Sequence, residues 1–356
     1  MTTPSSSAAP NRPAPGASSP RGRRTVDVPA LVEGVRAGDR GTIARAITLV
    51  ESTRPSHREA ASELLAALRE HTGHAVRVGI SGVPGAGKST FINAMGKRLV
   101  EAGELVGVVA VDPSSRRTGG SILGDRTRMA ELTALDGAFV RPSPSGRHLG
   151  GVARATRESM LILEAAGFGV IIVETVGVGQ NEIAVSEMVD TFLLLTLARA
   201  GDQLQGIKRG ILELADVITV NKADGDGAGP ARSAARELSG ALRLVIPDGR
   251  RPPVLTCSAL TGEGLDEVWQ AVLEHRAWLE SQGTLSARRA QQQEDWMWAI
   301  IDAHLTDAVR ESPTVRRIRA ETEAAVRAGT LSAVEGSTRL LDALVTDIRE
   351  GGLDTL

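Results

Sequence analysis

Apolar runs alternate with segments of helical periodicity along most of the chain. Six runs have the length of strands: Val76–Ile80, Val106–Val111, Val170–Val173, Thr191–Thr196, Val217–Val220 and Pro253–Thr256. Each run is apolar at successive positions rather than at every second one, which is typical of strands that are buried on both faces. The pattern therefore predicts an α/β fold, in which helices cover both faces of a mostly parallel sheet.

Helical patterns precede this region. Residues 29–72 predict three short helices. The third is expected to begin at Ser56, with Glu59 three residues later completing a capping box.

Helical patterns also follow the region of strands. The chain is helical from about Ser286, Ser312-Pro313 interrupts the pattern, and Ser332 with Glu335 is expected to cap the last helix. The first of these helices is unusually apolar at its start, at Trp296, Trp298, Ile300 and Ile301. Two interpretations of these apolar side chains stay open: they pack onto the main domain, or they contact a second copy of the chain.

These patterns divide the chain into four parts. Residues 1–26 are rich in Ser, Pro, Ala and Arg, contain no acidic residue, and predict a disordered tail. A mitochondrial transit peptide is the alternative interpretation of these residues. The five prolines among them disfavour the amphipathic helix that such a peptide needs. The other parts are an N-terminal helical segment (27–74), an α/β domain (75–282) and a C-terminal helical arm (283–356).

Composition narrows the class of protein. The 356 residues carry a net charge of -2, so no overall field favours nucleic acid or an anionic membrane. No apolar stretch is long enough to span a bilayer. Cys257 is the only cysteine, which excludes an internal disulfide and fits a cytoplasmic protein. The six histidines are scattered, so no histidine metal site is expected.

A phosphate-binding loop follows the first apolar run. Residues 82–89 fit the pattern G-x-x-x-x-G-K-[ST] between a strand and a helix, with Thr90 directly after: Gly82, Val83, Pro84, Gly85, Ala86, Gly87, Lys88 and Ser89. The glycines let backbone N–H groups surround the phosphates, and the helix N-terminus adds positive potential. Lys88 is expected to bridge the β- and γ-phosphates, and Ser89 to bind Mg²⁺.

Two later motifs predict that the base is guanine. Asn221-Lys222-Ala223-Asp224 follows an apolar run, and a carboxylate at Asp224 can accept hydrogen bonds from guanine N1–H and the 2-amino group, which adenine lacks. Cys257-Ser258-Ala259-Leu260 follows the last run and suits the loop whose backbone meets guanine O6. The nucleotide contacts expected here come from Asn221, Lys222, Asp224, Ser258, Ala259 and Leu260.

Acidic residues end two other runs. Glu174-Thr-Val-Gly177 occupies the position where GTPases carry D-x-x-G, so Glu174 is expected in the Mg²⁺ shell and the Gly177 N–H at the γ-phosphate. Asp112 ends the run Val106–Val111, on the ligand side of a parallel sheet. The candidate catalytic residues are therefore Lys88, Asp112, Glu174 and Gly177, and the residue that positions the attacking water stays undecided.

Four segments together resemble the MeaB/ArgK family of GTPases: Val111–Ser115, Gly120–Met129, Glu174–Gln180 and Gly206–Asp216. The resemblance extends from about residue 28 to the C-terminus. It implies a GTPase chaperone of an adenosylcobalamin-dependent methylmalonyl-CoA mutase, or of a related acyl-CoA mutase. GTP turnover would gate cofactor delivery and protect the mutase, and a cobalamin adenosyltransferase is a further expected partner. The C-terminal helices would form a homodimer.

The same resemblance assigns two groups of residues. Asp112, Asp125 and Glu174 would surround Mg²⁺ together with Ser89. Residues 202–208 would form a regulatory loop that responds to nucleotide and partner, with Asp202, Gln205 and Lys208 as its polar residues. Lys208 is one of only four lysines in a chain with 41 basic residues.

Three other functions share parts of this pattern. An ATPase or kinase of a lysine/arginine/ornithine transport system is disfavoured because Asp224 would be unpaired against adenine. A metal-inserting GTPase is expected to carry a His-rich tract or C-x-x-C, and the sequence has neither. A signal-recognition-type targeting GTPase is expected to be coupled to an RNA-binding domain.

Overall fold

The computed structural model describes residues 26–52, 54–111, 129–142, 149–175, 181–198, 209–246 and 249–350. Its strands form a seven-stranded sheet in the order β3-β2-β4-β1-β5-β6-β7, and every neighbouring pair is parallel. The strands are β1 (Val76–Gly82), β2 (Val106–Val111), β3 (Ala138–Arg141), β4 (Val170–Thr175), β5 (Thr191–Leu197), β6 (Val217–Asn221) and β7 (Val254–Thr256). The parallel α/β fold expected from the sequence is confirmed.

The six predicted strands are all present, and the sequence pattern missed one. Strand β3 is only four residues long and pairs at the edge of the sheet with β2 alone. A run of four residues, Ala-Phe-Val-Arg, is too short to show a strand period. Gly137, directly before it, lies against Val100, where an added Cβ would be 2.8 Å from Val100 Cγ1.

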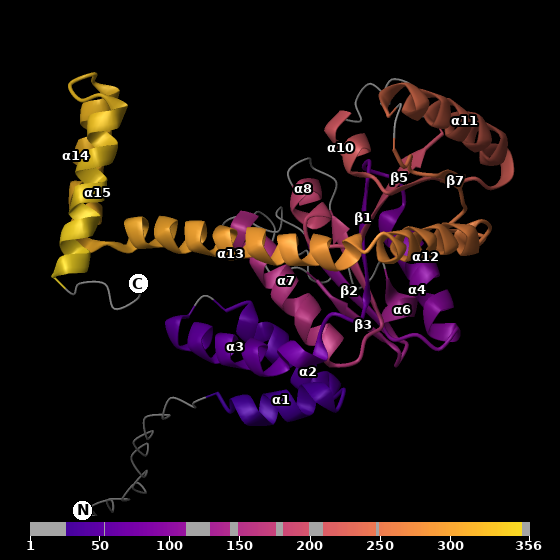
Figure 1. Cartoon of the computed structure of the whole chain (residues 1–356), viewed down its shortest axis with the longest axis horizontal. Coiled ribbons are helices and arrows are strands. Elements are labelled where there is room, and N and C mark those ends of the chain that lie inside the picture. The colour runs from indigo at the N-terminus through magenta and orange to yellow at the C-terminus, as the bar shows by residue number, and fades with distance from the viewer. Residues whose placement is uncertain are drawn as a thin grey trace, which may run out of the picture.

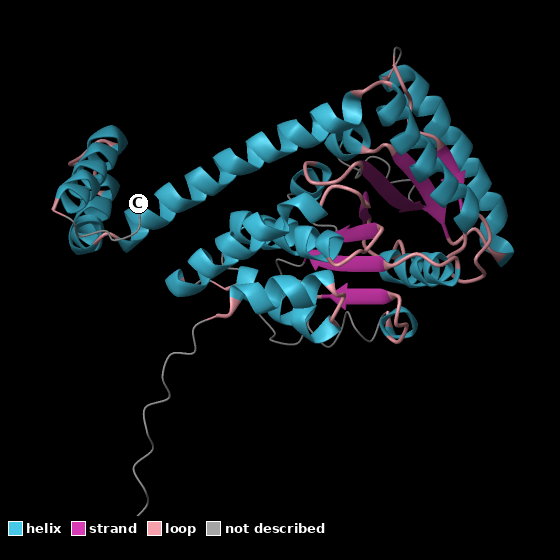
Figure 2. Cartoon of the chain, turned by 60° about the horizontal axis from the view of Figure 1, so that its bottom comes forward, coloured by secondary structure: helices cyan, strands magenta, loops and turns pink. Residues whose placement is uncertain are grey.

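Helices cover both faces of the sheet (Figure 2). One face carries α1 (Val28–Arg36), α2 (Arg40–Val50), α3 (Pro55–Leu68), α7 (Leu149–Ala165), α8 (Asn181–Ser186), α10 (Arg209–Leu214) and α11 (Ala228–Val245). The other carries α4 (Lys88–Glu101), α6 (Ala130–Thr133) and α12 (Leu265–Ser281). Two short 3₁₀ turns, η1 (Arg69–His71) and η3 (Gly225–Gly227), complete this body.

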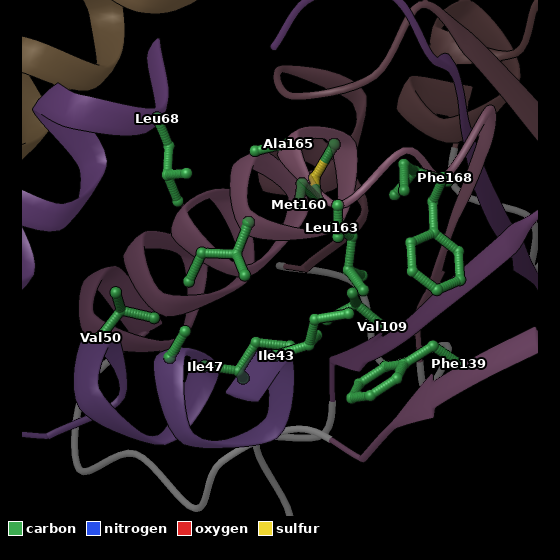
Figure 3. Close-up of a cluster of buried hydrophobic side chains, with 14 of the residues drawn as sticks. Ile43, Ile47, Val50, Leu68, Val109, Phe139, Met160, Leu163, Ala165 and Phe168 are labelled. Carbon is green, nitrogen blue, oxygen red and sulfur yellow. The ribbon is translucent and has the colours of Figure 1, made fainter. Parts of the chain in front are cut away.

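The N-terminal helices are part of the hydrophobic core. Ile43 and Ile47 of α2 are fully buried in one cluster with Leu163 of α7 (Figure 3). Phe139 of β3 meets Phe168 edge to face, with 6.1 Å between ring centroids. Because α1–α3 bury their apolar faces against α7, residues 27–74 pack onto the sheet domain instead of standing apart from it.

The predicted start of the third helix was wrong by one residue, and the capping box predicted for Ser56 and Glu59 does not form. Helix α3 begins at Pro55, its N-cap is Arg54, and no side chain caps it. Proline at the first position of a helix has its φ angle already set and removes one of the N–H groups that a cap would otherwise satisfy. The capping box at the start of the last helix is confirmed, with Ser332 and Glu335 bonding reciprocally.

A long helix leaves the body and carries a helical hairpin at its far end (Figure 1). Helix α13 (Thr284–Glu311) has 28 residues, about 42 Å at 1.5 Å per residue. The hairpin consists of α14 (Pro313–Arg327) and α15 (Ala333–Arg349) around a small core of its own. Asp347 joins it to the end of α13 by accepting hydrogen bonds from the Ser312 hydroxyl and the Thr314 N–H. Within the described ranges, no helix combines the length and the hydropathy that crossing a membrane requires.

A buried ionic network fastens the start of α13 to the amino edge of the sheet. Arg289 donates to both carboxylate oxygens of Asp190, at 2.8 and 2.6 Å. Asp190 is fully buried, and its Oδ2 also accepts from the Arg77 backbone N–H of β1 at 3.1 Å. The Arg77 guanidinium in turn binds Glu164 of α7 through two hydrogen bonds, at 2.7 and 2.9 Å. Strand β1, helix α7 and the arm are therefore held at one point.

We predict that Arg289→Ala lowers the free energy of unfolding by about 3–5 kcal/mol, because it leaves the buried Asp190 carboxylate without its cationic partner. Urea denaturation followed by circular dichroism measures the change. Arg319→Ala is the matched control, since it removes an equally short ion pair, to Glu323 on the exposed surface of α14, and should leave the free energy of unfolding nearly unchanged because water screens that pair. Equal effects of the two substitutions would contradict the anchoring role of Arg289.

Candidate functional site

The phosphate-binding loop connects the end of β1 to the start of α4. Gly82 ends the strand, and a Cβ there would lie 2.2 Å from the backbone oxygen of Leu195 on β5, so only glycine fits. Gly87 has a φ of +88°, and its Cβ would lie 2.9 Å from Asn221 Nδ2. The two glycines thus let the backbone of the loop lie against Leu195 of β5 and Asn221 of β6 before Lys88 begins α4.

Lys88 points back over this loop. Its ammonium donates to the Gly82 carbonyl oxygen at 2.8 Å, across the concave side of the turn. Burial lowers the pKa of Lys88, and the carboxylates of Glu174 and Glu182 act in the opposite direction. The loop therefore holds a partly buried cation next to the N-terminus of α4, and both features favour a bound polyphosphate.

Ser89 and Glu174 meet beside the lysine. The Ser89 hydroxyl, on the first turn of α4, donates to Glu174 Oε1 at 2.9 Å, and Glu174 is 7% exposed at the end of β4. A hydroxyl and a carboxylate are the oxygen ligands that Mg²⁺ prefers, so this pair fits a magnesium site. In the described ranges no cluster of three or more Asp, Glu, His or Cys forms a complete metal site. Asp112 and Asp125 lie outside the described residues.

The N-K-x-D motif ends β6 and is braced from two sides. Asn221 Nδ2 donates to the Ala86 carbonyl of the phosphate loop at 2.8 Å, and Asn221 Oδ1 accepts from the Ala259 N–H at 3.0 Å. The Ser258 hydroxyl donates to Asp224 Oδ1 at 2.7 Å. Asn221 therefore ties the phosphate loop to the base loop, and Ser258 fixes the carboxylate of Asp224 for two donors on a base.

Cys257 supports this site without being reactive. It is 1% exposed, and its Sγ lies 3.6 Å from Asn221 Oδ1. Burial raises the pKa of its thiol to about 12, so the thiolate is scarce at neutral pH.

The structure brings most of the predicted residues to one edge of the sheet. These residues all lie at the carboxyl ends of parallel strands or in the segments that directly follow them: 82–90, Glu174, Asn221–Asp224 and Ser258–Ala259. Leu260 lies in the same loop as Ser258 but is 81% exposed. Several predicted residues lie outside the described ranges: Asp112, Asp125, Gly177, Asp202, Gln205 and Lys208.

One acidic residue beside this site escaped the sequence analysis. Glu182, on the first turn of α8, is 2% exposed and acts electrostatically on Lys88. It stands in the first turn of α8, a position in which an acidic residue is ordinarily solvated. Only the packing of α8 on the sheet distinguishes it.

A phosphate loop and a guanine motif at the carboxyl edge of a parallel sheet define a P-loop GTPase. The chain belongs to the family described as methylmalonyl Co-A mutase-associated GTPase MeaB, whose model matches residues 43–314. The resemblance noted in the sequence and the expected GTPase activity are thereby confirmed, and a guanine nucleotide is the ligand of the family.

Individual relatives agree with this assignment. A probable GTPase of Mycobacterium tuberculosis is 58% identical over 91% of this chain and 96% of its own length. The mouse mitochondrial methylmalonic aciduria type A homolog is 44% identical over 89% of this chain and 79% of its own length. The crystal structure of a LAO/AO transport system kinase matches with a TM-score of 0.69 and 38% identity, over 88% of this chain and 96% of that one.

We predict that Asp224→Asn weakens GTP binding by about 10⁴-fold and transfers the preference to XTP, because an amide cannot accept from two guanine donors at once. Isothermal titration calorimetry with GTP, XTP and ATP measures this. Asp226→Asn, two residues further on, is the matched control and should bind GTP as the wild type does. Tight ATP binding by the wild type would contradict the guanine motif.

Proposed function

We propose that this GTPase is a chaperone of methylmalonyl-CoA mutase. Its GTP hydrolysis would gate the delivery of adenosylcobalamin to that enzyme and protect the enzyme from inactivation. The observation that carries the proposal is the match of residues 43–314 to a family described as mutase-associated. The name of the mouse relative, methylmalonic aciduria type A homolog, points to the same metabolism. A cobalamin adenosyltransferase is the source from which the cofactor would come.

The proposed nucleotide contacts follow from the site. Lys88 neutralises charge on the β- and γ-phosphates, and Asp224 with Ser258 reads guanine. Ser89 and Glu174, 2.9 Å apart, hold Mg²⁺ together with Asp112 and Asp125. The metal supplies charge neutralisation between the phosphates.

A transport-system kinase is the main competing function, because the solved structure at 38% identity carries that title. Its usual nucleotide, ATP, has no N1–H donor and no 2-amino group for Asp224. The Ser258 hydroxyl, 2.7 Å from Asp224, holds that carboxylate where such donors are required. The site therefore favours the GTPase function over an ATP-dependent kinase.

The arm is proposed to form a homodimer. Helix α13 exposes large apolar side chains on one stripe, where Trp298 is 56% exposed and Leu305 47% exposed. Trp296, two residues before Trp298, instead packs under the guanidinium of Arg157 on α7. Helix α15 exposes a second stripe at Leu341, Val345 and Ile348. Apolar stripes at helical spacing bury well against a copy of themselves.

We predict that Leu305→Glu raises the dimer dissociation constant by about 100-fold or more, since a carboxylate would lose its hydration in an apolar interface. Sedimentation velocity across a concentration series measures it. Leu244→Glu, at an 86% exposed leucine of α11, is the matched control and should sediment like the wild type. A wild type that is monomeric at high concentration would contradict the proposed dimer.

Residues 202–208 are proposed to relay the nucleotide state to the mutase. We predict that purified methylmalonyl-CoA mutase accelerates GTP hydrolysis by the wild type. Lys208→Ala should keep GTP affinity within about threefold but lower that acceleration tenfold or more, equivalent to about 1.4 kcal/mol of coupling.

Steady-state phosphate release with and without saturating mutase measures both quantities. Lys97→Ala is the control, because Lys97 pairs with Glu131 on the surface and lies away from the phosphate loop. Hydrolysis that is indifferent to the mutase would contradict the proposed function. Equal acceleration of wild type and Lys208→Ala would contradict only the relay.

A further inference from the structure

Glu182 is a buried carboxylate with one oxygen that has no hydrogen-bond partner, near the nucleotide site. It lies on the first turn of α8 and is 2% exposed. In the described part of the chain, nothing donates a hydrogen bond to its Oε2. A buried carboxylate oxygen left in this state has lost its hydration without gaining a hydrogen bond in return, which destabilises the fold. Groups that bear such a cost are concentrated at functional sites.

Packing fixes where this carboxylate lies. Helix α8 rests on the sheet where Gly79 of β1 leaves room for it, since a Cβ on Gly79 would be 2.8 Å from Val185 Cγ1. Val185 itself is fully buried. Because α8 is seated on the strand that ends in the phosphate loop, Glu182 is held beside that loop and has little freedom to turn towards solvent.

The charged group that Glu182 acts on is the ammonium of Lys88 in the phosphate loop. Two carboxylates act on the Lys88 ammonium, those of Glu174 and Glu182. Glu174 is already engaged, because its Oε1 accepts from Ser89 at 2.9 Å. Glu182 is the second acid that acts on the lysine, and its Oε2 is available to a donor.

The reactants of a GTPase restrict what that donor can be. The phosphate oxygens of GTP are acceptors and repel a carboxylate. The other reactant, water, donates hydrogen bonds and must be placed in line with the γ-phosphorus. We propose that Glu182 holds the attacking water, with Oε2 accepting one of its hydrogen bonds next to the γ-phosphate. This proposal rests on the nucleotide site proposed above.

The step balances without any further reagent. The water oxygen forms a bond to the γ-phosphorus, and the bond from that phosphorus to the β–γ bridging oxygen breaks. The bridging oxygen leaves on GDP with the electron pair. One water proton moves to a γ-phosphate oxygen, which gives dihydrogen phosphate. Glu182 orients the water and ends the step unprotonated.

Glu182→Gln tests the assignment in the full-length protein, because the side chain keeps its size but exchanges an acceptor oxygen for an amide donor. The single-turnover rate constant of GTP hydrolysis should fall about 100-fold or more, the usual loss for one transition-state group. The dissociation constants of GDP and of a non-hydrolysable GTP analogue should stay within about threefold. The Mg²⁺ concentration for half-maximal binding should not change. Glu187→Gln, at an exposed glutamate five residues later, is the matched control and should hydrolyse GTP at the wild-type rate.

A second variant covers the case in which Glu182→Gln does not fold. Glu182→Asp keeps the charge but withdraws the oxygen by about one bond length, so it should fold, bind GDP and lose tenfold or more in rate. Hydrolysis within threefold of the wild type in either folded variant would overturn the proposal. A loss of GDP affinity above tenfold, or a shifted Mg²⁺ dependence, would also overturn it, by showing that Glu182 positions Lys88 or the metal. If the wild type itself bound no guanine nucleotide, the proposed nucleotide site would fail first.

Discussion

The position of β1 is the constraint on which the rest of the structure depends. It is the central strand of seven and is paired in parallel with β4 on one side and β5 on the other. That register places Gly82 at the same edge as Glu174 of β4. The phosphate loop, Ser89 and Glu174 can meet only because these strands end together. Any slip of β1 would separate Ser89 Oγ from Glu174 Oε1, which are now 2.9 Å apart.

The two ends of β1 serve different purposes. Its carboxyl end leads into the phosphate loop, whereas its amino end is tied to the arm through Arg77, Asp190 and Arg289. The nucleotide and the arm thus attach to opposite ends of one strand. If the arm joins two copies of the chain, as proposed, each dimer half would be held directly at the strand that carries its nucleotide site. The far end of α13 with its hairpin extends away from the body (Figure 1).

The sheet was predictable from the sequence because buried parallel strands are continuous apolar runs, and six of the seven strands have that form. Strand β3 could not be predicted, because a strand of four residues is too short to show a pattern of hydrophobic positions. The phosphate loop and guanine motif were predictable because backbone geometry demands particular residues at fixed spacing. The hydrogen bond from Asn221 to the Ala86 carbonyl could not be predicted, because nothing in the sequence relates the orientation of that amide to a carbonyl 135 positions away. Glu182 escaped for a related reason: burial by a short helix turned an ordinary surface residue type into a charge inside the site.

The central proposal is that the carboxyl edge of the sheet holds Mg²⁺–GTP through the residues assembled there. A crystal structure of the chain with Mg²⁺ and a non-hydrolysable GTP analogue tests this most directly. We predict that the Lys88 ammonium leaves the Gly82 carbonyl for the β- and γ-phosphate oxygens, at about 3 Å. The Asp224 carboxylate should accept from guanine N1–H and the 2-amino group. A lysine that stays on Gly82 with the nucleotide bound, or a base that does not meet Asp224, would contradict it.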